Sequence, residues 1–505
     1  MKKVILFICL IILLVVGVGR SYVDVTPVSN MNFEYNEGLI YSLESLPDTI
    51  SPSESLNKGE EDLVSNIFSG LVEVNEKGEP IPDLAMGWTI SDDGLEYTFK
   101  INEKNKWSNG TEVTAKDFQI FFRDLLSPDN EDYTSNELYS IYGVKDYREG
   151  KIDFSEVAIN SPDDYTLVLR MNNKDDNLLK NLAKPIYRLR DLNEPLDNYK
   201  SDFNKISYTG PYIIYDVTKD GFIRLKDNPY NSSQLEIKDI AFKEKDSDEI
   251  ELAAFNLEKV DILKNPPIIY SEDIGLYKDL SKYNNDTLKL MLVNSDKAEM
   301  AQGISNIMKV LISDSNILKN NLGEPYIKVV NNKEEIASIK KDGANSNYNV
   351  SESEKNNLKE AGKNTLKKVL SNNEVLKIVV GNNEEDKALA NELKKVLDKE
   401  LSIKSIVKIY EEGIEEVIKS GEFNIAFGEF NLNEKNSENL KKEDIDKEEK
   451  KVEDNNEESE KETTSEKSNL SLVSLYFKND IWCKSPKVNY LFIDGNGNLI
   501  LKYSS

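Results

Sequence analysis

The stretch from Asn66 to Pro128 reads NIFSGLVEVNEKGEPIPDLAMGWTISDDGLEYTFKINEKNKWSNGTEVTAKDFQIFFRDLLSP. Two dipeptides in it, Asp93-Gly94 and Asn109-Gly110, are strong turn signals. Between these turns, residues 97–101 alternate apolar and polar side chains, which is the period of a half-buried strand. The stretch therefore predicts short strands that are joined by tight turns.

A helix is predicted directly after these strands. Thr114 is suited to be its N-cap, and Asp117 stands three residues later, as in a capping box. The helix would have an apolar face made of Phe118, Phe121, Phe122 and Leu125. Strands followed by such a helix indicate a domain that contains both α and β structure.

The order of residues in this stretch resembles the signature of the family 5 extracytoplasmic solute-binding proteins, the oligopeptide-binding type that serves ABC importers. Many signature positions are matched in fixed order, which makes a chance resemblance improbable. They are Ile67, Phe68, Gly70, Leu71, Gly78, Pro82, Leu84, Ala85, Trp88, Ser91, Asp93, Gly94, Tyr97, Thr98, Phe99, Trp107, Ser108, Gly110, Thr111, Thr114, Ala115 and Asp117. We expect Trp88 and Trp107 to be core residues.

The resemblance continues downstream and is strong over residues 35–265. Further matching elements are Ile141–Lys151, Ser161–Leu167, the Tyr208–Tyr212 turn, Ile223–Tyr230, Ile237–Phe242 and Ala253–Ile262. The Tyr208–Tyr212 segment, YTGPY, has no phosphate-loop lysine and is interpreted as a strand-entry turn. Glu258 departs from the pattern, because the family prefers glycine there.

The resemblance implies an α/β, periplasmic-binding-protein-like fold with two lobes, of class II, with an extra N-terminal subdomain. A first lobe is expected over residues 33–265, with the subdomain inserted at about 50–170. A second lobe is expected over residues 266–470. Residues 471–505 are expected to return to the first lobe. A chain of 505 residues is too long for one core, which agrees with this division.

The pattern of the second lobe predicts alternating helices and strands. Helices are expected at 301–318, 351–371 and 385–401, and strands at 375–380, 405–410 and 423–428.

Residues 434–467 differ in kind from the rest of the second lobe. They contain fourteen acidic, eight basic and only three aliphatic residues, so they cannot bury enough apolar surface to fold. We interpret them as a disordered acidic insert. It replaces a segment that, in peptide-binding relatives, carries an acidic residue for the amino terminus of the peptide.

The composition excludes several classes of function. A net charge of −27 disfavours nucleic-acid binding, because the chain would repel phosphate. The chain has no histidine, which removes the commonest general base and the commonest metal ligand. No nucleophile elbow, glycine-rich phosphate loop or metal-ligand set is recognisable. We therefore expect no enzymatic activity, no catalytic residue, no cofactor and no metal.

The N-terminus predicts export. Lys2 and Lys3 precede an apolar run from Val4 to Val18, which has the length of a signal-peptide core and is short for a membrane span. Residues 1–22 are thus a signal peptide or an N-terminal anchor, and both alternatives stay open. No lipid-acceptor cysteine follows this run, and Cys9 is interpreted as an apolar residue within it. The protein is expected outside the cytoplasm, tethered to the outer face of the membrane.

The candidate ligand contacts follow from the resemblance. In relatives, an extended peptide is held through its backbone by both lobes, as in strand addition. Glu429 or Glu434 could replace the acid that pairs with the peptide amino terminus. Aromatic residues of the return segment are further candidates, as are two residues after the first strand. The candidates are Ser45, Leu46, Glu429, Tyr476 and Trp482.

The predicted function is capture of an oligopeptide or similar small solute, and delivery to an ABC permease by a monomeric protein. The alternative is a degenerate relative that no longer transports and acts as a membrane-anchored sensor or interaction module. The missing lipid-acceptor cysteine, the missing arginines of the 301–318 helix and the acidic insert motivate this alternative.

Overall fold

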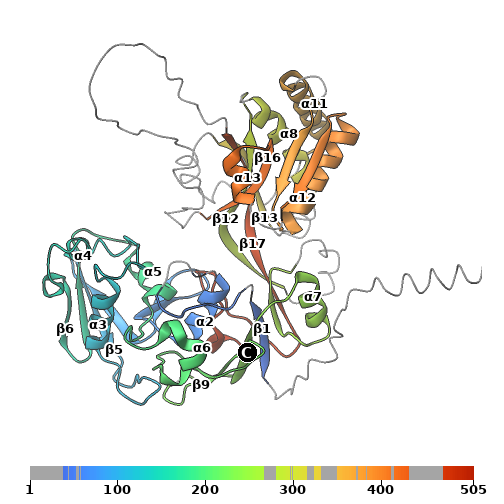
Figure 1. Cartoon of the computed structure of the whole chain (residues 1–505). Helices are drawn as coiled ribbons and strands as arrows, with labels where there is room; N and C mark the ends of the chain where they lie inside the picture. Colours follow the sequence, from blue (N-terminus) through green and yellow to red (C-terminus); the bar gives the residue numbers. More distant parts are fainter. Residues whose placement is uncertain are drawn as a thin grey trace, which may run out of the picture. The chain divides into compact units, whose positions relative to one another are not determined.

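The computed structural model describes residues 38–43, 45–52, 56, 58–231, 233–266, 280–295, 297, 299–314, 323–330, 350–370, 374–382, 384–410, 414–431 and 470–505. Figure 1 shows the whole chain, coloured along the sequence. The predicted export segment and the predicted acidic insert lie outside the described residues. In the described part of the chain, no helix is long and apolar enough to cross a membrane.

The first lobe is organised around one end of a large sheet. Strand β1 (Leu39–Leu43) pairs in parallel with β10 (Asp239–Glu244) and with β11 (Ile262–Lys264). Two further antiparallel strands, β9 (Ile223–Asp227) and β8 (Tyr212–Val217), complete this end. All five residues of β1 are buried, as expected for a central strand that is covered on both faces.

An inserted unit contains the strands and the helix that the signature stretch predicts. Its sheet has the order β4-β5-β7-β6. In β5, the predicted alternation is confirmed, because Tyr97, Phe99 and Ile101 are buried while their neighbours are more exposed. The strands are β4 (Ala85–Ile90), β5 (Glu96–Ile101), β6 (Ile159–Asp163) and β7 (Thr166–Arg170).

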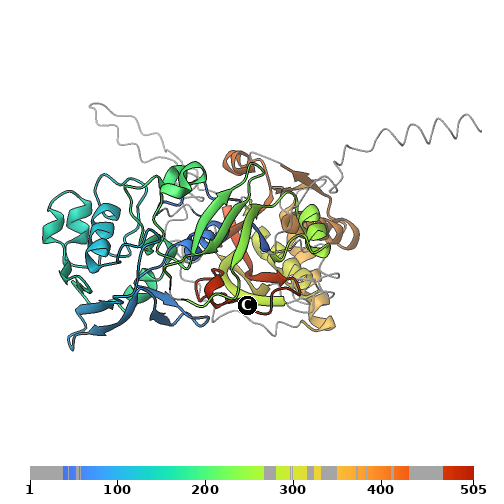
Figure 2. The ribbon, with the colours of Figure 1, turned by 90° about the horizontal axis from the view of Figure 1, so that it is seen from below.

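Helix α3 (Ala115–Leu125) covers this sheet and contacts β6 and β7 (Figures 1 and 2). The predicted capping box is confirmed: the Thr114 side chain accepts from the backbone N–H of Asp117, and the Asp117 carboxylate accepts from that of Thr114. The predicted apolar face is buried in full. Trp107 is buried as predicted, whereas Trp88 is half-buried against the same core.

The second lobe has the predicted alternation of helices and strands. Its strands are β12 (Leu280–Asn294), β13 (Gly323–Val330), β14 (Leu376–Val380), β15 (Ser405–Ile409), β16 (Ile425–Asn431) and β17 (Leu470–Lys484). Its helices are α8 (Glu299–Asp314), α11 (Glu352–Val369), α12 (Glu384–Lys395) and α13 (Ile414–Ser420). Helix α12 continues as a π-helical turn, Val396–Glu400.

Within the described residues, eleven strands form one sheet. Its order is β15-β14-β16-β12-β17-β11-β1-β10-β9-β8, and β13 pairs with β17 outside this path. Strands β12 and β17 are each fifteen residues long and pair along most of their lengths. These two strands therefore belong to the ladders of both lobes.

The remaining elements are a separate two-stranded antiparallel sheet, made of β2 and β3, and the helices and turns that connect the strands. They are α2 (Lys58–Ile67), β2 (Val72–Val74), β3 (Pro80–Pro82), α4 (Val144–Arg148), α5 (Leu178–Leu182), α6 (Tyr199–Asp202), α7 (Asp248–Asn256), and 3₁₀ turns at Phe154–Glu156, Pro185–Tyr187, Leu196–Asn198, Phe203–Lys205 and Leu501–Tyr503.

The end of α7 gives a physical reason for the glycine that the family prefers at position 258. Glu258 adopts a left-handed backbone conformation, with φ of 54°. Its N–H donates to the Phe255 carbonyl, and the N–H of Lys259 donates to the Ala254 carbonyl. This pair of bonds is the Schellman motif, whose left-handed position is usually glycine because a Cβ atom is disfavoured there.

We expect Glu258→Gly to be more stable than Glu258→Ala by about 1 kcal/mol. Both variants lose the glutamate side chain, so their difference reports the strain of a Cβ atom in the left-handed conformation, reduced by the extra freedom that glycine has in the unfolded chain. Urea unfolding of the two variants measures this difference. Equal midpoints and equal slopes would contradict the explanation.

Candidate functional site

The candidate site lies where two parallel strands of the second lobe end. Strands β14 and β16 are parallel, with Ile378 opposite Ile425, so their carboxyl ends reach the same edge. Helix α12 begins four residues after β14 ends, at this edge. In open α/β sheets, ligands bind in the crevice outside the carboxyl ends of the strands.

Polar residues cross the sheet at this edge in one row. Glu429 of β16 stands opposite Lys289 of β12, and Lys289 stands opposite Tyr476 of β17. Residues directly opposite each other point to the same face of a sheet. The face that carries Leu288 and Leu290 is the opposite one, and these two residues belong to an apolar core.

Ion pairs connect this row to the start of α12. We call these residues the charged row: Lys289, Glu385, Asp386, Glu429, Tyr476 and Lys478. The ammonium group of Lys289 contacts the carboxylate of Asp386 and lies 3.1 Å from Oε1 of Glu429. Lys289 is only 1% exposed, so its charge requires these partners. Carboxylates in the first turn of α12 are also favoured by the helix dipole.

Lys478 connects Glu429 to Glu385, the third acid of the row. Its Nζ lies 2.8 Å from Oε1 of Glu429 and 3.2 Å from Oε2 of Glu385. The hydroxyl of Tyr476 donates to Oε1 of Glu385. Tyr476 is buried, and its hydrogen bond therefore satisfies a polar group that would otherwise be costly to bury.

The charges of the row stabilise one another. Burial raises the pKa of Glu429, but Lys289 and Lys478 outweigh burial and lower this pKa to about 2. Burial lowers the pKa of Lys289, yet Asp386, Glu385 and Glu429 outweigh it, and the net shift is upward. Burial raises the pKa of Asp386 in spite of Lys289. Glu429 is consequently a carboxylate at any physiological pH.

Glu429 is the most exposed of the ion-paired side chains in the row, ahead of Lys478 at 23%. Its side chain is 37% exposed, against 1% for Lys289 and 9% for Glu385. Both of its ion pairs use the same atom, Oε1. The row contains three carboxylates and two ammonium groups, so it carries one negative charge in excess. This arrangement is suited to receive one cationic group at Glu429.

The structure brings two of the five candidate residues together. Glu429 and Tyr476 lie in the charged row, where Lys478 and Glu385 connect them. Trp482 lies elsewhere, fully buried beside Tyr41 of β1 at 5.7 Å between ring centroids. The ammonium group of Lys264 lies 4.7 Å from its ring.

The other two candidates lie in the first lobe. The hydroxyl of Ser45 donates to Glu60 of α2 at 2.8 Å. Leu46 is half-buried against the apolar core of that lobe. The structure thus distributes the predicted candidates over both lobes without joining all five. Glu434, the other predicted acid, lies outside the described residues.

Sequence reasoning missed Lys289, Lys478, Glu385 and Asp386. One signal was present for Lys289, because it is a lone charge within an apolar strand, Leu288-Lys289-Leu290-Met291. A charged residue in such a run requires a partner. Glu385 and Asp386 gave no such signal, since acidic residues are common in the first turn of a helix.

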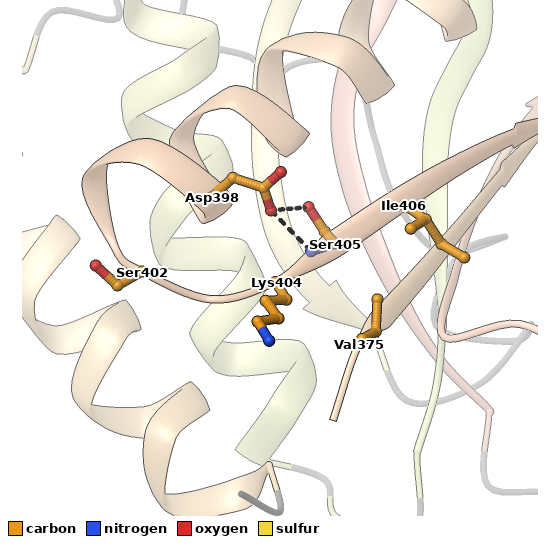
Figure 3. Close-up of a pocket in the computed structure, with 6 residues that line it drawn as sticks. All are labelled: Val375, Asp398, Ser402, Lys404, Ser405 and Ile406. Atoms are coloured by element: carbon orange, nitrogen blue, oxygen red, sulfur yellow. Dashed lines mark hydrogen bonds between the residues drawn. The ribbon is translucent and has the colours of Figure 1, made fainter. Parts of the chain in front are cut away.

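A separate hollow of about 510 Å³ lies beside β15 (Figure 3). Its lining includes Val375, which precedes β14, and Ser405, which begins β15, so it lies at the amino ends of these strands. The acid there, Asp398, already accepts two hydrogen bonds from Ser405, at 2.7 Å and 2.9 Å. The position and the bonded acid make this hollow a weaker candidate than the charged row.

Comparison with known proteins supports the family resemblance that the signature stretch indicates. The family model of bacterial extracellular solute-binding proteins, family 5 Middle, matches residues 79–304. The oligopeptide-binding protein OppA of Bacillus subtilis is 27% identical over 280 residues, which are 51% of each chain. The oligopeptide-binding protein AliB of Streptococcus pneumoniae is 32% identical over 230 residues, 43% of this chain and 34% of the relative. The match thus spans about half the length of the first relative and about a third of the second.

Solved structures extend the likeness of fold to almost the whole chain. The murein tripeptide binding protein MppA of Escherichia coli superposes with a TM-score of 0.62 at 14% identity, covering 93% of this chain and 98% of that one. Peptide-bound OppA of Listeria monocytogenes has a TM-score of 0.60 at 17% identity, covering 93% and 99%. The predicted α/β fold with two lobes is therefore confirmed.

The family match ends at residue 304, within α8, so Lys289 lies inside the matched residues and the other members of the charged row lie beyond them. Members of the matched family are extracellular proteins that bind solutes. The resemblance predicted from the signature stretch is confirmed, because residues 79–304 match the model of the middle region of the family 5 extracellular solute-binding proteins.

Proposed function

We propose that this protein captures short peptides outside the cytoplasm and delivers them to an ABC permease. Relatives named oligopeptide-binding proteins support this proposal, as does the fold shared with MppA and OppA. The observation that carries it is the charged row, in which a half-exposed carboxylate, Glu429, lies at the carboxyl edge of the parallel strands.

In this proposal, Glu429 binds the amino group of the peptide. Its Oε1 atom is held by Lys289 and Lys478, which fixes the carboxylate before the ligand arrives. Such preorganisation reduces the entropy that is lost on binding. The single excess negative charge of the row matches the single positive charge of an amino terminus. The peptide backbone would add hydrogen bonds of the strand-addition type, which depend little on peptide sequence.

The other candidates have different roles in this proposal. Ser45 and Leu46 are proposed contacts from the first lobe. Tyr476 supports the row by its bond to Glu385, and Trp482, being fully buried, supports the strand on which it lies.

We further propose a monomer without enzymatic activity that binds no nucleic acid, since its net charge of −27 would repel phosphate. The apolar run within residues 1–22 supports tethering at the outer face of the membrane. The domain bounds predicted from the sequence are retained as part of this proposal.

The experiment is peptide binding by the wild-type protein and by Glu429→Gln. A library of dipeptides to octapeptides is first screened by thermal unfolding, since a ligand at ~100-fold over its Kd adds about 2.7 kcal/mol. The best peptide is then titrated by calorimetry. Loss of the charged partner is expected to weaken binding about 100-fold, and N-acetylation of the peptide is expected to weaken binding to the wild type similarly.

Glu422→Gln is the matched control, because Glu422 lies just before β16, is exposed and lies outside the charged row. It should bind the peptide as the wild type does. Equal affinity of Glu429→Gln and wild type would overturn the role of Glu429. Absence of binding by any peptide, with folded protein, would overturn the proposed function.

A further inference from the structure

The ladder between β12 and β17 is regular at both ends and irregular in its middle. At one end Leu280 stands opposite Cys483, and at the other Asn294 stands opposite Leu470. The register shifts between the pairs Asn284–Asn479 and Leu288–Phe477, and again between Lys289–Tyr476 and Leu290–Ser474. The first shift is the larger one, and on its other side Lys478 stands opposite Gly323 of β13. Asn479 lies toward the part of β17 that pairs with β11. Phe477 lies in the part of β17 that pairs with β13.

Lys478 is the one β17 residue inside this irregular part of the ladder. Residues 285–287 of β12 stand between the two regular pairs, whereas only residue 478 of β17 stands between them. The ladder therefore places three residues against one. Extra residues of this kind bend a strand, loosen its pairing and are frequent next to binding sites. Such positions are also suited to absorb the backbone changes of a hinge.

The side chain of Lys478 reaches from this irregular part into the charged row. It contacts Glu429 of β16 and Glu385 of α12, at 2.8 Å and 3.2 Å. Burial lowers the pKa of Lys478, but Glu385 and Glu429 outweigh burial, and the net shift is upward. The residue of β17 that stands against residues 285–287 of β12 is thus a charged member of the row.

We propose that Lys478 is a positioning residue that couples the charge state of Glu429 to the irregular part of the β12–β17 ladder. While Glu429 is an unliganded carboxylate, it restrains Lys478 and with it the backbone of β17 at this point. A cation that binds Glu429 repels Lys478, which keeps Glu385 as its partner. The restraint on residues 285–287 then weakens. The identity of the cation, a peptide amino group, rests on the proposed function.

The coupling can be tested without any ligand by a double-mutant cycle on the full chain. The variants are Glu429→Gln, Lys478→Gln and the double variant, with Lys377→Gln as control. Lys377 lies on β14 and pairs only loosely with Glu422, at 3.9 Å. The measurement is native-state amide hydrogen exchange of residues 285–287, which reports local opening. Exchange in β5 (Glu96–Ile101) reports whether a variant has lost global stability instead.

We expect each single variant to accelerate exchange at residues 285–287 about tenfold, with β5 unchanged. The double variant should exchange no faster than Lys478→Gln, because Glu429 acts through Lys478. Lys377→Gln should exchange as the wild type does. An unchanged rate in Glu429→Gln would overturn the proposal, and so would accelerations that multiply in the double variant.

A second arm repeats the exchange measurement with a saturating peptide that has a free amino group. The peptide should alter exchange at residues 285–287 in the wild type and leave Lys478→Gln unaltered. An equal response of both proteins would overturn the coupling. If no peptide binds the wild type while the cycle shows coupling, the proposed function fails and the coupling stands.

Discussion

Gly210→Ala is expected to destabilise the protein by at least about 3 kcal/mol. A Cβ atom at this position would lie 2.4 Å from the carbonyl carbon of Ile67 and 2.6 Å from the backbone nitrogen of Phe68. Non-bonded carbon atoms are at their optimum at about 3.5–4.0 Å, so contacts this short are strongly repulsive. Both neighbours are backbone atoms at the end of α2, and no rotation of a side chain can relieve the overlap.

The turn that carries Gly210 is held from several directions, so it cannot shift away from α2 at low cost. The N–H of Gly210 donates to the Ile67 carbonyl, and its own carbonyl accepts from the Asn228 side chain. The neighbouring Thr209 hydroxyl donates to the Leu189 carbonyl. Moving the turn by the ångström or so that a methyl group requires would break several of these buried bonds.

Gly87→Ala is the matched control for this prediction, because nothing lies within 4 Å of a Cβ atom at that position. It should change the free energy of unfolding by less than about 0.5 kcal/mol. Urea unfolding of both variants, followed by circular dichroism, makes the comparison. Similar stabilities of the two variants would show that the contact between the turn and α2 is far looser than the structure indicates.

Local signals in the sequence were sufficient for elements whose geometry depends on near neighbours. The capping box at Thr114 and the buried face of α3 were predicted because they depend on spacing within one helix. The strand-entry turn at Tyr208–Tyr212 was likewise predicted, and β8 begins at Tyr212. The structural reason for its glycine could not be predicted, because Ile67 is remote from Gly210 in the sequence.

The charged row illustrates what local signals cannot provide. Glu429 was predicted as a candidate from the resemblance, yet its partners Lys289 and Lys478 come from two other strands. Which lysine reaches which carboxylate depends on the register of β16, β12 and β17, and a shift of one residue would turn Lys289 to the opposite face. Register across distant strands is set by the whole fold and leaves no local pattern.

Trp482 shows that residue type alone does not separate a core residue from a ligand contact. It was proposed as a ligand contact because aromatic residues often line binding sites, and a return strand was expected near the site. Its ring is buried beside Tyr41, with the ammonium group of Lys264 4.7 Å away, and its role as a ligand contact stays a prediction. A large aromatic residue in a strand is compatible with either role, so residue type could not distinguish core from site.

Lys289→Met is expected to cost about 3–5 kcal/mol of stability at pH 7–8, because removing one partner of a buried ion pair leaves the other charge poorly compensated. Lys289 is 1% exposed and contacts both Asp386 and Glu429. Glu429 retains Lys478, at 2.8 Å, whereas Asp386 loses the cation that lowers its pKa. The variant should therefore lose stability mainly because the charge of Asp386 is no longer balanced.

The loss of stability caused by Lys289→Met should be smaller at acidic pH. Burial already holds the pKa of Asp386 above its ordinary value of 3.8, and loss of Lys289 raises it further. The native variant then binds a proton at Asp386 more tightly than the unfolded chain does. Its stability falls as pH rises from 3.8 through the native pKa, so the difference from wild type should be smaller at pH 5 than at pH 8.

Urea unfolding at pH 5 and pH 8 tests this prediction with two further variants. Lys289→Met combined with Asp386→Asn should regain much of the lost stability at pH 8, because it removes the charge that Lys289 balanced. Lys377→Met, which loosens only the 3.9 Å pair with Glu422, should cost less than about 1 kcal/mol at either pH. A cost that is the same at both pH values, with no rescue by Asp386→Asn, would show that Lys289 contributes through packing rather than through its charge.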